Sequence, residues 1–199
     1  MHNTLLIGID EAGRGALAGP VCAGAVAAPE DLDWREIYAL VTRRGEIRLR
    51  DSKQLSAQQR DTIFAAIEEH GRLRHAHALV SADVVDAIGI ANAAREAAAI
   101  ALSQLGISSG RARVLLDAGL SVSSEWGQEQ FIRGDETIPV IALASVVAKV
   151  MRDRHMEDLA LAHPRYGFER HKGYGTPLHY AMIRAHGTLP IHRRTFVHI

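Results

Sequence analysis

The sequence is poor in cysteine, in aromatic residues and in long apolar runs. One cysteine, Cys22, stands among 199 residues, which excludes an internal disulfide and a metal site built from several thiolates. Because Cys22 lies in an apolar run, we expect a buried structural thiol. No stretch reaches the roughly 18 apolar residues of a membrane helix, and no basic-then-apolar leader opens the chain. We therefore expect a cytoplasmic protein without a membrane part.

A net charge of either sign is also missing, because 23 Lys and Arg balance 23 Asp and Glu. The balance conceals two regions of opposite charge. Residues 1–148 hold 14 Lys and Arg against 19 Asp and Glu, whereas residues 149–199 hold 9 against 4 and seven of the eleven histidines. This asymmetry suits a polyanion bound by the basic segment and cations bound by the acidic one. An unevenly charged, solvated surface is the alternative.

Patterns typical of strands and helices alternate along the chain. Apolar runs and alternation predict strands over 5–9, 20–27, 72–80 and 113–117, and a further short strand or turn over 131–135. Caps and periodicity predict helices from Ser56 to near Gly71, from Ser81 to Ile88, over 91–105, over 139–161 and from Thr176 to Gly187. The order predicts an α/β fold with a mixed sheet. We expect one domain over 1–199, in which 163–199 is a helical appendage.

Two adjacent carboxylates, Asp10 and Glu11, end the first apolar run and precede the turn Gly13-Arg14-Gly15. The glycines permit positive φ and let a ligand approach the backbone closely. Neighbours in a regular strand point to opposite faces, so both acids reach one site only if the chain leaves strand geometry between them. A capping role for Asp10 beside a solvated Glu11 is the alternative.

Two further acids follow the predicted strands at the same edge of the sheet. Asp117 ends the strand over 113–117, and Asp135 follows Gly134. With Asp10 and Glu11 they form a candidate catalytic and metal-binding set of four carboxylates. Carboxylate oxygens suit Mg²⁺ or Mn²⁺, and two such ions can stabilise the attacking and leaving oxygens of phosphodiester hydrolysis.

These residues belong to an ordered series of motifs along nearly the whole chain. The motifs are Gly8–Gly15 (GIDEAGRG), Leu17–Val21 (LAGPV), Asp51–Leu55 (DSKQL), Asp117, Gly134-Asp135, Ala144–Val150 (ASVVAKV) with Arg152–Arg154 (RDR), His171–Thr176 (HKGYGT) and His192–Phe196 (HRRTF). In this order and spacing the chain resembles the ribonuclease HII family, the bacterial type 2 ribonucleases H.

The resemblance implies a ribonuclease H-like mixed sheet flanked by helices, with a small C-terminal helical part that contacts substrate. It implies two-metal hydrolysis of RNA in RNA/DNA hybrids and cleavage on the 5′ side of ribonucleotides in duplex DNA, leaving 3′-hydroxyl and 5′-phosphate ends. Asp10, Glu11, Asp117 and Asp135 would bind the two Mg²⁺ or Mn²⁺ ions. A replication clamp is a candidate partner, and we expect a monomer.

An enzyme that separates RNA from DNA must detect the ribose 2′-hydroxyl, which backbone groups of Gly13, Arg14 and Gly15 can approach. Tyr174 could stack on a sugar or base beside the cleavage site; a core or turn aromatic is the alternative. Ser52 and Lys53 could contact a phosphate near the cut. The roles given to Tyr174 and to Ser52 and Lys53 depend on the resemblance to the family.

On the predicted helix over 139–161, Ser145, Lys149 and Asp153 recur every four residues and share one face. That face could follow the duplex backbone, with Arg152 beside it. An ordinary ion pair between Lys149 and Asp153 is the alternative. Arg193 and Arg194 are further phosphate-contact candidates.

The eleven histidines are predicted to be surface or polar-contact groups rather than a zinc site. Candidates such as His155, His171 and His179 lack the spacing of a helical ligand pair beside an acid. Surface histidines gain charge in mild acid and would then strengthen binding to nucleic acid.

Two other functions remain open at this level. A DNA junction nuclease of the same fold would use a similar acidic cluster, although the Gly-Arg-Gly turn and Tyr174 argue against it. A non-catalytic nucleic-acid-binding module would weaken its own phosphate binding by keeping four acids without cations.

Overall fold

The computed structural model describes residues 4–39 and 55–198. Its centre is a five-stranded mixed sheet in the order β3-β2-β1-β4-β5. The strands are β1 (Leu5–Ala12), β2 (Val21–Pro29), β3 (Arg74–Val80), β4 (Ala112–Asp117) and β5 (Gly127–Phe131). β1, β2 and β3 pair antiparallel, whereas β4 lies parallel to both β1 and β5. The prediction of a mixed α/β sheet is confirmed.

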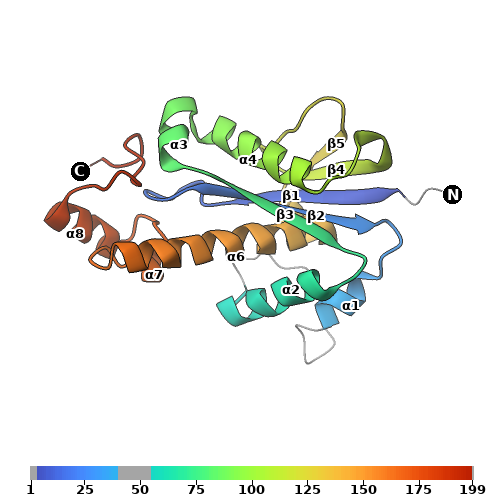
Figure 1. The fold of residues 1–199 in the computed structure, drawn as a ribbon, viewed down its shortest axis with the longest axis horizontal. Helices are drawn as coiled ribbons and strands as arrows, with labels where there is room; N and C mark the ends of the chain where they lie inside the picture. Colours follow the sequence, from blue (N-terminus) through green and yellow to red (C-terminus); the bar gives the residue numbers. More distant parts are fainter. Residues whose placement is uncertain (1–3, 40–54, 199) are drawn as a thin grey trace.

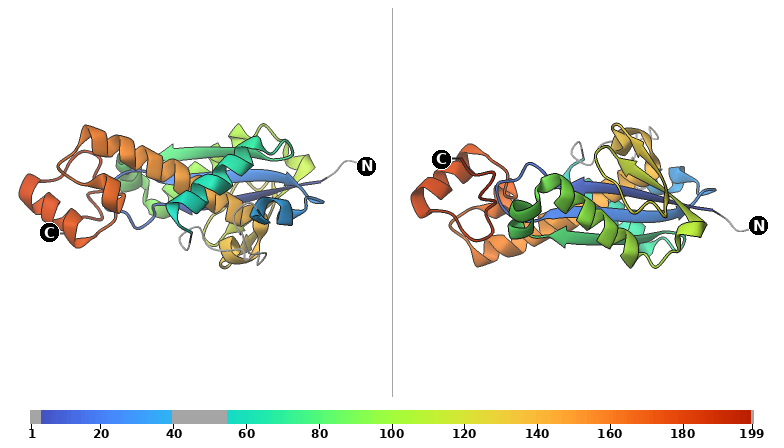
Figure 2. Two further views of the ribbon diagram at one scale, coloured as in Figure 1. Left: turned by 90° about the horizontal axis from the view of Figure 1, so that it is seen from below. Right: turned by 90° about the horizontal axis from the view of Figure 1, so that it is seen from above.

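Helices cover both faces of this sheet (Figures 1 and 2). They are α1 (Trp34–Ala39), α2 (Ala57–Glu69), α3 (Ala82–Ile88), α4 (Ile90–Gln104), α5 (Gly134–Thr137), α6 (Pro139–Ala162), α7 (Phe168–His171) and α8 (Pro177–His186), with a 3₁₀ turn at Ser109–Arg111. The alanine-rich α4 packs on one face, and the long α6, with α2 outside it, packs on the other. None of the helices in the described ranges is long and apolar enough to cross a membrane.

Small residues let α6 lie directly on the sheet. A Cβ atom added to Gly8 would lie 2.2 Å from the Val140 carbonyl oxygen, and one added to Gly24 would lie 2.3 Å from that of Ala144. Both distances are far inside van der Waals contact, so glycine is required for this approach. The close contact places Ser145 and Lys149 of α6 beside the end of β1. Cys22 is buried in β2, as predicted, and burial raises the pKa of its thiol to about 12.

Helix caps agree with the sequence signals at two positions. Ser56 accepts a hydrogen bond from the Gln59 amide while the Gln59 side chain accepts one from the Ser56 amide, which completes the predicted capping box. Thr176 caps α8 in the same way through the His179 amide. Ser81 precedes α3 but makes no side-chain cap, so that prediction holds for position only.

The region around Asp135 differs from its prediction. The strand β5 occupies 127–131, earlier than expected, and Asp135 lies in the first turn of α5 rather than at a strand end. Arg133 adopts a left-handed backbone conformation, with φ of 56°, that turns the chain sharply between the two elements. β5 was not predicted over these residues because its sequence is mostly polar and lacks the alternation of buried and exposed residues that is typical of strands. The four-residue α7 was also not predicted.

The helix α8 lies at one end of the molecule, beyond the end of α6, and the short α7 lies beside the C-terminal half of α6 (Figure 1). Their small core is built around Tyr166, Phe168 and Ile183 and includes Met156 and Ala160 of α6. Two isolated bridges, Ala16 with Tyr174 and Ala18 with His192, join this part to the loop after β1. The loop that carries the Gly-Arg-Gly turn is therefore held by the C-terminal part of the chain.

Three histidines lie inside this small core. His171 and His179 stack with ring centroids 4.3 Å apart, and the Nε2 atoms of His179 and His192 are 3.1 Å apart. All three are buried, and burial lowers their pKa values, that of His179 to about 4. They are polar-contact groups, as expected, and their lowered pKa values work against the gain of charge in mild acid that was predicted for histidines.

Candidate active site

The strand register brings Asp10 and Asp117 to the same edge of the sheet. Ile9 of β1 pairs with Leu116 of the parallel strand β4, so the next residues of the two strands are Asp10 and Asp117. The backbone N–H of Gly134 donates to Oδ1 of Asp117 over 2.9 Å. That bond attaches the start of α5, with the buried Asp135, to the end of β4. β1, β4 and α5 thus each present one acid at this edge.

Asp10 lies in an unfavourable environment for a negative charge. Burial raises its pKa well above the usual value, and the charges of Glu11 and Asp117 raise it further. Hydrogen bonds from the Ser145 side chain and from the Glu11 amide, the latter 2.7 Å long, act in the opposite direction but are weaker. Negative charge is therefore concentrated where water is largely excluded.

Glu11 lies in regular strand geometry, so the condition stated for Asp10 and Glu11 to reach one site, a departure from strand geometry between them, is not met. β1 continues to Ala12, with Asp10 opposite Gly24 and Glu11 opposite Ala23 of β2. The Glu11 carboxylate instead lies 3.0 Å from Nη1 of Arg14, three residues along in the turn. The turn and the acid pair are thereby linked directly.

The chemistry of the four acids suits a hard divalent cation. All donors are carboxylate oxygens, and a cation would relieve the repulsion that raises the pKa of Asp10. Within residues 4–39 and 55–198, however, no three His, Cys, Asp or Glu side chains are grouped as a ready-made ion site. Binding would require the carboxylates to close around the ion, with Glu11 exchanging its contact to Arg14.

Beside the acids lies a cavity of about 430 Å³. Its lining includes Glu11, the turn Gly13–Gly15, Arg60, Ser145, Lys149 and Tyr174. The cavity therefore brings together the predicted substrate residues of the Gly13–Gly15 turn, of α6 (Ser145 and Lys149) and of the C-terminal part (Tyr174), but not the phosphate-contact candidates Arg193 and Arg194. Ser52 and Lys53 lie outside the described residues.

The family model for ribonuclease HII matches residues 7–199. The chain belongs to the ribonuclease HII family. Members of this family are metal-dependent endoribonucleases. The ribonuclease HII of Halalkalibacterium halodurans is 40% identical over 95% of this chain, and that of Geobacillus kaustophilus 42% identical over 96%. The chain spans only 66% and 67% of these two relatives, but 94% of the Novosphingobium aromaticivorans enzyme, to which it is 39% identical.

Solved structures of type 2 ribonucleases H share the fold. Ribonuclease H2 from Pyrococcus horikoshii superposes with a TM-score of 0.74 at 25% identity, covering 96% of this chain and 93% of that one. Ribonuclease HII from Archaeoglobus fulgidus, solved in complex with PCNA, gives 0.69 at 23% identity, with 98% and 96% covered. The ribonuclease H-like architecture implied by the sequence resemblance is confirmed.

Within this ribonuclease HII fold, Lys149 forms the ion pair that was the alternative interpretation of its helix face, and its contact with the duplex backbone stays a prediction. Its Nζ atom lies 2.7 Å from Oδ1 of Asp153, so the helical ion pair exists. The same atom lies 5.7 Å from the centre of the Tyr174 ring, and both residues line the cavity. The Asp153 carboxylate therefore holds the ammonium group of Lys149 at the edge of the cavity that is the candidate substrate site.

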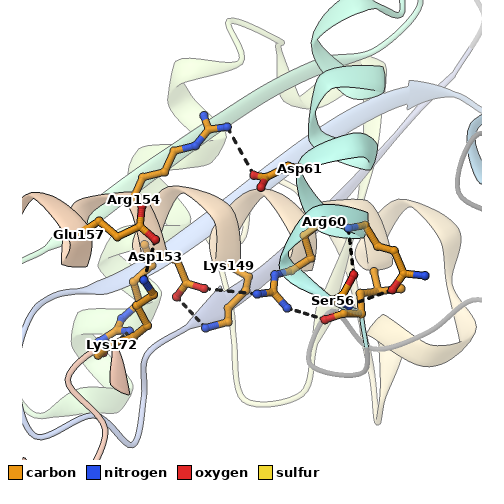
Figure 3. A network of polar contacts seen from close by, with 11 residues as sticks. Ser56, Arg60, Asp61, Lys149, Asp153, Arg154, Glu157 and Lys172 are labelled. Atoms are coloured by element: carbon orange, nitrogen blue, oxygen red, sulfur yellow. Dashed lines mark hydrogen bonds and ion pairs between the residues drawn. The ribbon is translucent and has the colours of Figure 1, made fainter. Parts of the chain in front are cut away.

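Arg60 of α2 is a cavity residue that sequence reasoning missed (Figure 3). Its Nη2 atom lies 3.6 Å from Oδ2 of Asp153, and Nη1 donates to the Leu55 carbonyl over 2.7 Å. A signal for it exists in the sequence. Arg60 precedes the buried Ile63 and Phe64 by three and four residues, so a charged side chain stands on the apolar face of α2.

Proposed function

We propose that this chain hydrolyses the RNA strand of RNA/DNA hybrids and cuts duplex DNA on the 5′ side of an embedded ribonucleotide, leaving 3′-hydroxyl and 5′-phosphate ends. The observation that carries the proposal is the cavity lined by Glu11, the Gly13–Gly15 turn, Ser145 and Tyr174. Ser145 also hydrogen-bonds to Asp10, which supports a cation site next to a glycine turn that would receive a ribose.

Asp10, Glu11, Asp117 and Asp135 would hold two Mg²⁺ or Mn²⁺ ions. When bound, such ions activate a water molecule and stabilise charge on the attacking and leaving oxygens. Ser145 orients the carboxylate of Asp10 by hydrogen bonding to it. Because the pKa of Asp10 is raised, a proton competes with a cation for this carboxylate, so metal binding would strengthen as pH rises.

The other wall of the cavity would recognise the nucleic acid. Backbone groups of Gly13, Arg14 and Gly15 would contact the ribose 2′-hydroxyl, and Tyr174 would stack on the neighbouring sugar or base. Lys149 would contact a phosphate as a point charge. Ser52 and Lys53 retain their predicted phosphate role from the family resemblance.

The segment 163–199, which forms one end of the molecule (Figure 2) and includes Tyr174, would contact the duplex. Its excess of basic residues supports this role. The archaeal relative solved with PCNA makes a replication clamp a candidate partner here. We infer a monomer that acts on one duplex at a time.

A cleavage assay tests the proposal with a labelled DNA duplex that contains one ribonucleotide. We expect Mg²⁺-dependent cleavage by the native chain and a loss of at least about 100-fold in Asp10→Asn, since one electrostatic stabiliser is removed. Glu96→Gln, an exposed acid on α4 across the sheet, is the matched control and should keep full activity.

Two further arms identify the reaction. An all-DNA duplex should remain intact; its cleavage would instead indicate a DNA nuclease of the same fold. Phosphatase treatment should change the mobility of the downstream fragment, because that fragment carries the 5′-phosphate. Equal cleavage by native and Asp10→Asn proteins would place the reaction elsewhere.

A further inference from the structure

Two arginines lie wholly inside the protein beneath the Gly13–Gly15 turn. Arg152 comes from the middle of α6 and Arg193 from the C-terminal loop, and both side chains have an exposed fraction of 0%. Arg193 was predicted to contact a substrate phosphate, and its burial shows that this prediction is wrong. Arg152, expected beside the helix face of Ser145 and Lys149, is also buried, so both guanidinium groups serve the protein's own backbone.

The guanidinium of Arg193 binds three carbonyl oxygens of the loop after β1. Nε donates to Gly19 over 3.0 Å, and Nη1 donates to Gly13 over 2.8 Å and to Arg14 over 2.9 Å. Hydrogen bonds from a charged donor are stronger than neutral ones. Two successive carbonyls of the turn are therefore fixed toward the protein interior.

Arg152 holds the same loop from α6. Its Nε, Nη2 and Nη1 atoms donate to the carbonyls of Pro20, Ala18 and Lys172 over 3.0, 3.2 and 2.9 Å. The Lys172 bond reaches the segment that carries Tyr174, whose ring centre lies 5.2 Å from the Arg152 guanidinium carbon. One side chain thus fixes the turn and Tyr174 relative to each other.

The arrangement leaves little room for change. Gly13 has φ of 91°, and a Cβ atom added there would lie 2.0 Å from Nε of Arg152. Any other residue would displace the arginine and adopt an unfavourable backbone conformation. The first glycine of the turn is therefore required by the buried arginine as well as by access for a ligand.

The geometry of the peptide bond converts these contacts into a substrate-facing surface. In a planar trans peptide the carbonyl of one residue and the N–H of the next point in opposite directions. Because Arg193 draws the carbonyls of Gly13 and Arg14 inward, the N–H groups of Arg14 and Gly15 point outward, on the side where this turn lines the cavity. Two successive N–H donors make a concave site for an oxygen atom.

The burial of Arg193 is not explained by stability alone. Its Nη2 atom is buried and has no hydrogen-bond partner among the described residues, which is unfavourable for a guanidinium N–H. Burial lowers the pKa of Arg193 to about 10, so the group stays charged at neutral pH. A buried charge with an unpaired nitrogen is unfavourable for stability, so we attribute the burial of Arg193 to the backbone geometry that it gives the turn.

We propose that Arg193, together with Arg152, is a positioning residue for ribose recognition: it orients the turn so that the N–H groups of Arg14 and Gly15 meet the 2′-hydroxyl. This inference rests on the proposed function and deepens it. Discrimination between ribose and deoxyribose then depends on two side chains that never touch the nucleic acid.

The test compares binding of two duplexes that differ by one 2′-hydroxyl, with the protein in the inactive Asp10→Asn background and Ca²⁺ in place of Mg²⁺. Arg193→Lys keeps the charge but has one nitrogen in place of the forked guanidinium. We expect its preference for the ribonucleotide duplex to fall at least about fivefold, the value of one lost hydrogen bond. Affinity for the all-DNA duplex should change by less than about twofold.

Arg95→Lys, an exposed position on α4, is the matched control and should leave the preference unchanged. Thermal unfolding of each variant separates folding from recognition. A merely structural role for Arg193 would lower the melting temperature and weaken both duplexes alike. That result, an unchanged ratio, overturns the inference.

If Arg193→Lys does not fold, Arg152→Lys undergoes the same ratio measurement with the same expected fall. The parent protein distinguishes the two levels of the proposal. A parent that shows no preference for the ribonucleotide duplex contradicts the proposed function and the inference together. A parent that shows the preference while both lysine variants retain it contradicts the inference alone.

Discussion

Two clusters of buried charge flank the Gly13–Gly15 turn, and they are in opposite states. At the sheet edge, Asp10 faces the like charges of Glu11 and Asp117, and its pKa is raised. Beneath the turn, Arg152 and Arg193 face backbone carbonyls, and five of their six side-chain nitrogens donate hydrogen bonds. In the arginine cluster nearly all side-chain donors are paired within the chain, whereas in the acidic cluster the like charges are not compensated.

The difference separates chemistry from positioning. A site with uncompensated like charges stores unfavourable free energy that a bound ion can release, which is what a catalytic metal site requires. A buried guanidinium that donates to several backbone carbonyls serves to fix the backbone. The sign of a mutation's effect on stability should therefore differ between the two clusters.

The largest expected effect is that of Arg152→Ala on stability. It leaves the carbonyls of Ala18, Pro20 and Lys172 without their donor in the interior, so the free energy of unfolding should fall by about 3 kcal/mol or more. Asp10→Asn should instead leave it unchanged or raise it by about 1 kcal/mol in the presence of EDTA, because a buried repulsive charge is removed. Urea unfolding measures both.

Arg154→Ala is the control on the same helix. Arg154 is exposed and makes an ion pair with Asp61 and a contact to the Phe64 ring, so its loss should lower the free energy of unfolding by less than about 1 kcal/mol. A strong destabilisation by Asp10→Asn, equal to that by Arg152→Ala, would show that the charges of the acidic cluster are also compensated within the chain and would break the comparison.

A smaller effect is expected from pH on the core that supports the turn. The folded pKa of His179, about 4 because of burial, lies below the ordinary histidine value of about 6.5. The unfolded chain then binds more protons between these values. Stability is fully present above about pH 6.5 and falls as pH drops toward 4, by at most about 1.4 kcal/mol per pH unit.

Unfolding in urea at pH 7.5 and at pH 5.5 measures this loss. His179→Gln should reduce the difference between the two conditions, whereas His186→Gln, an exposed residue at the end of α8, should keep it. If His179→Gln retains the full native pH dependence, the buried histidines do not control the acid stability of this region.

Most of the helices and strands were predictable from sequence because their signals are local. The capping box at Ser56, the length of α6 and the Thr176 cap each depend on residues a few positions apart. β5 was placed too late because its residues are polar and half exposed at a sheet edge, where periodicity is weak. Asp135 was misplaced with it, on a helix turn that Arg133 starts in a left-handed conformation.

The site was predictable where motifs carry its chemistry and not where long-range contacts build it. The four acids and the turn stand in recognisable spacings, but no spacing reveals that Arg193 binds carbonyls 174 to 180 residues away. The same residue type fits a phosphate contact equally well in sequence. Only burial distinguishes the two roles, and burial is a property of the whole fold.

The smallest expected effect concerns Lys149, which lies between the two clusters. Its Nζ atom is held by Asp153 at the cavity edge, with Arg60 on the other oxygen of the same carboxylate. If Lys149 contacts one phosphate, Lys149→Gln should weaken duplex binding several-fold and reduce the dependence of log affinity on log salt by about 1.

The salt dependence separates a phosphate contact from a purely structural ion pair. Arg154→Gln, whose guanidinium pairs with Asp61 outside the cavity, should leave the slope unchanged. A structural role for Lys149 would lower stability through the lost Asp153 contact while the slope stayed at its native value. Arg60 still forms an ion pair with Asp153 when Lys149 is replaced, so the free energy of unfolding should change by less than about 1 kcal/mol. A reduced salt slope in such a stable variant identifies Lys149 as part of the nucleic-acid surface.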